Sequence, residues 1–348
     1  MMAWKIALIV AVAALNVAAA EEKCISPEMS VSYRILDDEG NPVPDVQCRG
    51  WIRQFDAKGG GHSYSLVSDT NGVVTIAGKC SVSFTAFFTK SGFYMSHLEP
   101  CLDADGTGSA IRDGKWQPYG EMRTVVLKRI KNPVRLRDPD ARCCHKYPES
   151  GEWVGFDLKI GDWVPPLGNG KCADMMVRYT REQRTDGYFK SLDVSFTNCP
   201  YAGVYLMKKD LYSEMDSVYT ALTNGEYVSS LRYEFERTAT GNHMIGELGR
   251  EQYLVFRIRT KVDCDGKLVS AHYGRIMGDW RYVDKGGMLL GPVFFNPTPN
   301  DTNLEDAETA RRSSQMWGTP SGVAQTEPFW TSSGFASLLS VGKAWVRE

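Results

Sequence analysis

The sequence predicts an all-β fold: two antiparallel β-sandwich domains followed by an irregular C-terminal extension. Short segments in which apolar and polar residues alternate recur between residues 25 and 295. Turn pairs such as Asn71-Gly72 and Asp265-Gly266 lie between these segments, and such pairs are typical of β-hairpins. A chain of 348 residues is also long enough for two domains, each with its own core.

The first 20 residues are predicted to be an export signal. Lys5 precedes an apolar run from Ile6 to Leu15, and small residues follow at Ala18 and Ala20. A basic start, a short apolar run and small residues before a cleavage site are typical of secretory signals. The run is too short to span a membrane, which takes about 20 apolar residues. We therefore expect a secreted, periplasmic or cell-surface chain, cleaved near Ala20, with no transmembrane segment after cleavage.

The charge of the chain argues against one class of partner. The net charge is −2, and no long basic run occurs. Proteins that bind nucleic acid concentrate Lys and Arg on one surface. We expect no nucleic-acid partner.

Residues 25–132 are predicted to form the first sandwich, because two of their segments alternate clearly. One face carries Val46, Cys48, Gly50 and Ile52, and one face of "CSVSFTAFF" carries Cys80, Val82, Phe84, Ala86 and Phe88. Asn71-Gly72 precedes a further strand as a hairpin signal. In the same domain, "DADGTG" (residues 103–108) is interpreted as a turn, with a calcium loop as the alternative.

Three turn motifs of this domain carry a family resemblance. Gly40, Pro42, Val43 and Val46 match a G-x-P-V-x-x-V stretch, residues 68–72 match a T-D-x-N-G hairpin with the Thr shifted, and residues 90–94 match a strand that ends in K-x-G-Y. Residues 25–132 thus resemble the carboxypeptidase regulatory-like domain, a small transthyretin-like β-sandwich. The resemblance implies a spacer, folding aid or adhesion unit beside another module, and it implies no chemistry of its own.

Residues 133–150 are predicted to be a linker because they are rich in proline and charge. Within them, Cys143-Cys144-His145 could be a nucleophile with its base, part of a metal site, or disulfide half-sites. Neighbours in sequence rarely have the geometry of a nucleophile and base, and no further ligands follow at short spacing. We interpret Cys143 and Cys144 as disulfide partners or structural thiols.

Residues 151–295 are predicted to form the second sandwich. Leu192, Val194 and Phe196 share one face, as do Leu231, Tyr233 and Phe235. In the hairpin around Asp265-Gly266, Phe256 and Ile258 are expected to face the core, and Arg257 and Arg259 to face solvent. Residues 296–348 are predicted to be an irregular tail with a short surface helix capped by Asn303, packed over the second domain.

All nine cysteines follow the signal, and an exported chain favours disulfides. Because nine is odd, at least one thiol is expected to lack a partner within the chain. Cys48 and Cys80 fit either a disulfide across the first sandwich or two buried small side chains. Cys172 and Cys199 flank two consecutive strands and are the pair predicted in the second sandwich.

The predicted ligand-binding residues lie in "GEWVGFDLKIGDW". Trp153 and Trp163 could stack on sugar rings, while Asp157 and Asp162 accept hydrogen bonds from sugar hydroxyls. The alternative is that both tryptophans are core or sheet-edge residues, since such rings bury large areas.

The motif search names no catalytic residue, metal site or cofactor, because no nucleophile elbow, zinc-protease helix, phosphate loop or dinucleotide fingerprint occurs. The leading hypothesis is an exported, non-catalytic binding or structural module of the cell envelope or surface. Its expected partner is a glycan or another envelope component, bound by the second sandwich. The competing hypothesis is a glycan-directed hydrolase with a carboxylate pair in that sandwich.

Overall fold

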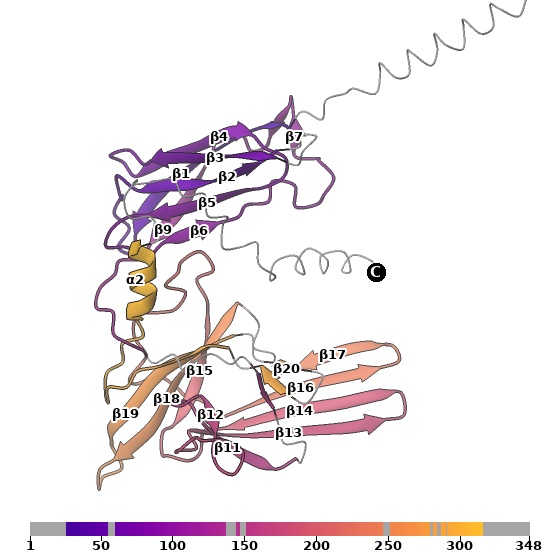
Figure 1. Cartoon of the computed structure of the whole chain (residues 1–348), viewed down its shortest axis with the longest axis vertical. Coiled ribbons are helices and arrows are strands. Elements are labelled where there is room, and N and C mark those ends of the chain that lie inside the picture. The colour runs from indigo at the N-terminus through magenta and orange to yellow at the C-terminus, as the bar shows by residue number, and fades with distance from the viewer. Residues whose placement is uncertain are drawn as a thin grey trace, which may run out of the picture. The chain divides into compact units, whose positions relative to one another are not determined.

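The computed structural model of the chain describes residues 26–54, 60–136, 144–146, 151–245, 251–278, 281–283, 287–289 and 291–315. These residues form 22 strands and one helix (Figure 1). The predicted all-β, sandwich-like fold is confirmed. The predicted signal at residues 1–20, Cys143, and the tail beyond residue 315 lie outside the described residues.

The first sandwich contains nine strands. They are β1 (Glu28–Asp37), β2 (Gln47–Arg53), β3 (Gly61–Val67), β4 (Val73–Lys79), β5 (Phe84–Thr89), β6 (Ser96–Leu98), β7 (Ile111–Arg112), β8 (Lys115–Trp116) and β9 (Glu121–Leu127). One sheet has the order β4-β1-β8-β7, with β9 also paired to β1, and the other has the order β3-β2-β5-β6. Because β1 and β9 run parallel, this sandwich is not antiparallel throughout.

The core of the first sandwich follows the alternation in the sequence. On β2, Cys48 and Ile52 are buried, and on β5 so are Phe84, Ala86 and Phe88. Side chains two residues apart on a strand point to the same face, so each strand contributes one apolar row to the space between the sheets. The predicted inward faces of both segments are therefore confirmed for these residues.

The Asn71-Gly72 turn does not form the predicted hairpin. It follows β3 and precedes β4, but these strands belong to different sheets. The carboxylate of Asp69 accepts hydrogen bonds from the N–H groups of Asn71 (2.9 Å) and Val73 (2.7 Å), and Gly72 has a φ of +72°, which glycine adopts at little cost. The turn chemistry is the expected one, but the turn carries the chain from one sheet to the other.

The second sandwich is built from the strands that follow. They are β10 (Cys144–Lys146), β11 (Trp153–Asp157), β12 (Asp162–Trp163), β13 (Met175–Arg184), β14 (Gly187–Ser195), β15 (Gly203–Lys208), β16 (Ser230–Thr238), β17 (Gly241–Ile245), β18 (Gln252–Val262), β19 (Leu268–Met277), β20 (Arg281–Val283), β21 (Gly287–Leu289) and β22 (Val293–Phe295). The sheets have the orders β12-β11-β13-β14-β16-β17, β15-β18-β19-β22 and β10-β21-β20. Part of the predicted linker, β10, is thus a strand paired with β21.

The expectation that Arg257 and Arg259 face solvent is wrong. Arg257 is 7% exposed, and the side chain of Arg259 is 22% exposed and ion-paired. The reason is that β18 lies between β15 and β19 and packs on both faces. Phe256 belongs to one hydrophobic cluster, whereas Val255 belongs to another on the opposite face.

The segment after β22 begins as ordered structure and leads into helix α2 (Ala307–Gln315). Asp306 caps this helix, since its carboxylate accepts the N–H of Thr309 (2.9 Å). The predicted cap, Asn303, instead accepts the N–H of Glu305 (2.9 Å). The helix buries Thr309, Ala310 and Ser313 and exposes its other face, as a surface helix does.

Among the described residues, no helix has the length and hydropathy needed to cross a membrane.

Candidate functional site

The two predicted tryptophans have different environments. Trp163 is 4% exposed and packs edge-on against Phe156, with ring centroids 5.1 Å apart. Trp153 is 42% exposed, and the guanidinium of Arg178 lies 4.8 Å from its ring centroid. Trp163 is therefore a core residue, as the alternative interpretation held, and only Trp153 presents a ring to solvent.

Asp157 is a buried structural carboxylate. It accepts hydrogen bonds from the backbone N–H groups of Lys159, Ile160, Lys171 and Cys172, and it pairs with Arg259 at 2.8 Å. Burial by itself would raise the pKa of Asp157, but these donors hold the pKa below its ordinary value. The carboxylate is fully occupied in holding two loops against β18.

Arg259 joins Asp157 to a second carboxylate, Asp174. Its Nε lies 2.7 Å from Asp174 Oδ1, and burial raises the pKa of Asp174 although Arg259 lowers it. Arg259 has a φ of +51° next to a register shift between β18 and β19. A β-bulge re-aims side chains in this way, and here it turns the guanidinium toward both carboxylates.

Asp162 stabilises a turn. Its carboxylate accepts the N–H groups of Trp163 (2.8 Å) and Asn169 (2.8 Å). Asp157 is therefore occupied by protein donors, whereas Asp162 is half-buried and bonded to the backbone of its own turn. The structure does not bring the four predicted residues together as one binding site.

A cavity of about 550 Å³ lies beside Trp153. Nine of its ten lining residues are apolar, and the remaining one is Glu152. Binding sites combine apolar walls with a few polar groups that orient the ligand. This cavity has only one polar side chain, that of Glu152.

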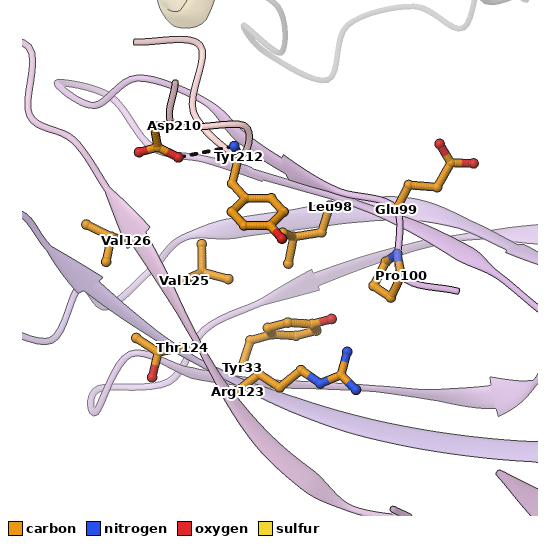
Figure 2. Close-up of a pocket in the computed structure, with 10 residues that line it drawn as sticks. All are labelled: Tyr33, Leu98, Glu99, Pro100, Arg123, Thr124, Val125, Val126, Asp210 and Tyr212. Atoms are coloured by element: carbon orange, nitrogen blue, oxygen red, sulfur yellow. Dashed lines mark hydrogen bonds between the residues drawn. The ribbon is translucent and has the colours of Figure 1, made fainter. Parts of the chain in front are cut away.

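A second cavity, of about 400 Å³, has a more varied lining (Figure 2). It lies where β6 and β9, the edge strands of the two sheets of the first sandwich, approach each other. The segment 209–217, which follows β15, completes its wall. The lining residues are Tyr33, Leu98, Glu99, Pro100, Arg123, Thr124, Val125, Val126, Asp210 and Tyr212.

Tyr33 and Arg123 are neighbours on paired strands, β1 and β9. Figure 2 shows the phenol and the guanidinium next to each other on one side of the cavity. Tyr33 is 1% exposed, and its hydroxyl has no hydrogen-bond partner among the described residues. Burial raises the pKa of Tyr33 to about 12, although the nearby Arg123 lowers it. The cavity therefore has a neutral phenol beside a guanidinium.

Arg123 is held by Glu121, two residues earlier on the same face of β9. Its Nε donates to Glu121 Oε2 at 2.7 Å, and its side chain is 38% exposed. This pair neutralises the guanidinium while keeping it at the cavity.

Tyr212 is fixed through its backbone rather than its ring. Its carbonyl accepts the N–H of His97 on β6 (2.8 Å), and its N–H donates to Asp210 Oδ1 (3.1 Å). Asp210 in turn pairs with Lys128 at 2.9 Å. Tyr212 itself is 58% exposed, so an open aromatic ring is held in a defined place.

Among the described cysteines, neither the Cys48–Cys80 nor the Cys172–Cys199 disulfide is formed in the structure. Cys48, Cys80, Cys172 and Cys199 are free thiols. Cys80 donates to the carbonyl of Ser83 (3.3 Å), and burial raises the pKa of Cys48 and of Cys80 to about 12. The alternative interpretation of Cys48 and Cys80, two buried small side chains, describes them as the structure has them.

Cys144 lies on β10 opposite Leu289. The "DADGTG" stretch behaves as a turn, because Asp103 accepts the N–H of Gly108 (2.9 Å) and Asp105 that of Thr107 (3.0 Å). In the described part of the chain, no three His, Cys, Asp or Glu side chains are grouped as metal ligands.

Comparison with known proteins adds little. No family model and no curated protein matches the chain. Among solved structures, it is similar to 3-chlorocatechol 1,2-dioxygenase from Rhodococcus opacus 1CP, with 12% identity, a TM-score of 0.25, and coverage of 32% of this chain and 63% of that one. For catechol 1,2-dioxygenase from Acinetobacter sp. ADP1 the values are 14%, 0.24, 34% and 59%. The chain thus spans less than two thirds of either enzyme, and similarity this low carries no argument about activity.

Sequence reasoning missed the cavity of Figure 2. Tyr33 lies on β1, a strand in which the sequence predicted no functional residue. Tyr212 lies in a stretch without strand periodicity, far beyond the last strand of the first sandwich, which ends at Leu127. No spacing signal connects the two, and only the contacts of segment 209–217 with β6 do so.

Proposed function

We propose that the chain is an exported, non-catalytic binding module whose small-molecule site is the cavity between β6, β9 and segment 209–217. The observation that carries the proposal is the lining of this cavity, in which the phenol of Tyr33 and the guanidinium of Arg123 lie next to each other (Figure 2) and the ring of Tyr212 is exposed. The side chain of Arg123 is 38% exposed, so its guanidinium can donate a hydrogen bond to a polar ligand atom in the cavity.

The surroundings of the cavity support this function. The volume of about 400 Å³ is within the range of small-molecule sites. Leu98, Pro100 and Val125 supply apolar wall, whereas Tyr33, Arg123 and Glu99 supply polar groups. The sequence suggested a ligand site in the second sandwich, whereas this cavity lies at the edge of the first.

The hydrolase hypothesis has less support. A glycosidase needs two carboxyl groups about 5–9.5 Å apart that are free to act as acid and as base or nucleophile. Asp157 and Asp162 are instead occupied by backbone N–H groups. A general acid also needs a raised pKa, and the pKa of Asp157 is lowered.

The test is a thermal-shift screen of the purified protein against a library of small polar molecules, followed by calorimetry. A ligand at 100 times its dissociation constant stabilises the folded state by about 2.7 kcal/mol. We expect at least one such ligand, whose binding is weakened by Arg123→Gln. The matched control is Arg112→Gln, because Arg112 is an exposed arginine of the same sandwich that does not line the cavity.

Two outcomes would contradict the proposal. One is a screen in which no molecule stabilises the protein. The other is binding that both substitutions leave unchanged, because the ligand would then occupy a different site. Release of reducing ends from a glycan by the purified protein would favour the hydrolase instead.

A further inference from the structure

We infer that the ligand of this cavity is a neutral sugar ring that stacks on Tyr212; the inference rests on the proposed function and names its ligand class. Three properties of the cavity lead to this class: an open aromatic ring held by the backbone, polar groups of both hydrogen-bonding kinds, and the absence of an excess positive charge.

The first property is the ring of Tyr212. Its exposed fraction of 58% is large for an aromatic residue in a segment whose backbone is bonded to β6. Among the described residues, no aromatic ring or cation packs on it. The tyrosine ring has a flat apolar face and a polar hydroxyl, so it suits a ligand that is apolar on one face and carries polar groups around its edge. The C–H face of a sugar ring, edged by hydroxyls, is such a partner.

The second property is the mixture of donors and acceptors. Arg123 only donates hydrogen bonds, whereas the carboxylate of Glu99 only accepts them. Figure 2 shows Tyr33 and Arg123 on one side of the cavity and Glu99 beside Pro100 at another. A ligand that bonds to both Arg123 and Glu99 needs groups that accept and groups that donate, and sugar hydroxyls do both.

The third property is charge. The lining residues carry one positive charge, on Arg123, and two negative charges, on Glu99 and Asp210. Arg123 is already paired with Glu121, and Asp210 with Lys128. An anionic ligand would meet the carboxylate of Glu99 without a spare cation, whereas a cationic ligand would meet the guanidinium. A neutral ligand avoids both repulsions.

The arrangement is built before the ligand arrives. The carboxylate of Asp210 accepts a hydrogen bond from the N–H of Tyr212 and pairs with the ammonium of Lys128. The backbone of Ser213 also forms an isolated β-bridge with Ser96 on β6. Because the backbone at Tyr212 is already fixed, binding costs little backbone conformational freedom there. Segment 209–217 therefore positions Tyr212 for stacking.

The test is saturation-transfer NMR with glucose, galactose, mannose and N-acetylglucosamine, each as the free sugar and as its short oligomer. We expect at least one to bind the purified protein. Tyr212→Ala should weaken that binding about tenfold, which equals about 1.4 kcal/mol. The control is Tyr119→Ala, the same change at an exposed tyrosine of the first sandwich outside the cavity.

The possible results separate this inference from the proposed function. If the small-molecule screen finds a ligand that competes at Arg123 but no sugar binds, the ligand class is wrong and the binding function stands. If a sugar binds equally well to Tyr212→Ala and to Tyr119→Ala, the assignment of the site to Tyr212 is overturned. If neither sugars nor any other molecule binds, both proposals fail.

Discussion

The hydroxyl of Tyr94 donates a hydrogen bond to Glu305 Oε1 at 3.1 Å, across 211 positions of sequence. Tyr94 belongs to the first sandwich, and Glu305 follows the last strand of the second. Glu305 also accepts the backbone N–H groups of Lys131 (2.7 Å) and Asn132 (2.6 Å) and is 1% exposed. One buried carboxylate thus ties three stretches of the chain together.

We expect Glu305→Ala to lower the free energy of unfolding by about 3 kcal/mol or more, because three donors would lose their acceptor in a buried place. Urea unfolding followed by tryptophan fluorescence measures this change. Glu308→Ala is the control, since Glu308 is an exposed carboxylate on α2. Equal effects of the two substitutions would mean that the Glu305 hydrogen bonds add no stability.

Replacement of Arg259 by Met should cost about 3–5 kcal/mol, because it leaves the buried carboxylates of Asp157 and Asp174 without their shared cation. Arg232→Met is the comparison, since Arg232 also pairs with two carboxylates but has a side chain that is 53% exposed. We expect a change below about 1 kcal/mol there. Denaturant midpoints that fall equally in both variants would contradict the role assigned to the triad.

Stability should fall as the pH is lowered from about 4 toward 2. Hydrogen bonds from Asn41 and Arg129 hold the pKa of Asp37 well below its ordinary value, although burial by itself would raise it. A carboxyl with a lowered pKa stabilises the folded state above the unfolded value of about 3.9, and this contribution is lost as acid protonates it. The pKa of Asp157 is also lowered, so its protonation likewise reduces stability in acid. The pKa of Asp174 is raised, so its protonation favours the folded state instead.

The variant Asp37→Asn tests this assignment. Its free energy of unfolding should change less steeply with pH below 4 than that of the wild type, because one titrating group is gone. Urea titrations at a series of pH values give the slope. A slope equal to that of the wild type would show that Asp37 does not contribute to the acid response.

The folded protein should protect the thiols of Cys48 and Cys80 from alkylation. Both are 0% exposed, and their raised pKa disfavours the reactive thiolate. Cys101 and Cys264 are exposed and should react first with iodoacetamide at pH 8. Peptide mass spectrometry without reductant provides the measurement, and a crosslinked Cys48–Cys80 peptide would favour the disulfide predicted from the sequence.

Tyr33→Phe should weaken ligand binding without lowering the stability of the unliganded protein. The substitution removes a buried hydroxyl that has no partner among the described residues and keeps the ring that packs edge-on against Phe88, with centroids 5.3 Å apart. Calorimetry and thermal unfolding of the same variant report the two quantities. A loss of stability comparable to that of a buried hydrogen bond would show that the hydroxyl is already satisfied in the folded protein.

Several features of the fold could be predicted because they depend on neighbours in sequence. The alternation in "CSVSFTAFF" places Phe84, Ala86 and Phe88 on one face of a strand whatever the rest of the chain does. The Asp265-Gly266 turn likewise joins β18 and β19 as an antiparallel hairpin. Such features need only backbone geometry and the apolar or polar character of each side chain.

Other features required knowledge of which elements meet. Whether Arg257 faces water depends on what covers β18, and whether Asn71-Gly72 closes a hairpin depends on which sheet each flanking strand joins. Trp153 and Trp163 have the same side chain and lie ten residues apart, yet only Trp163 is enclosed by the core. The residues next to each tryptophan in the sequence did not indicate which of the two would be buried and which exposed.

By itself, the sequence determined that the chain is all-β and which strand faces are apolar, because these follow from alternation and turn residues. Only the tertiary structure decided which residues line the cavity that we propose as the ligand site. The cavity combines Tyr33, Arg123 and Tyr212, which come from three distant parts of the chain and meet where β6 and β9 approach each other. Contacts of this kind arise from the packing of sheets and connecting segments, and no spacing along the chain encodes them.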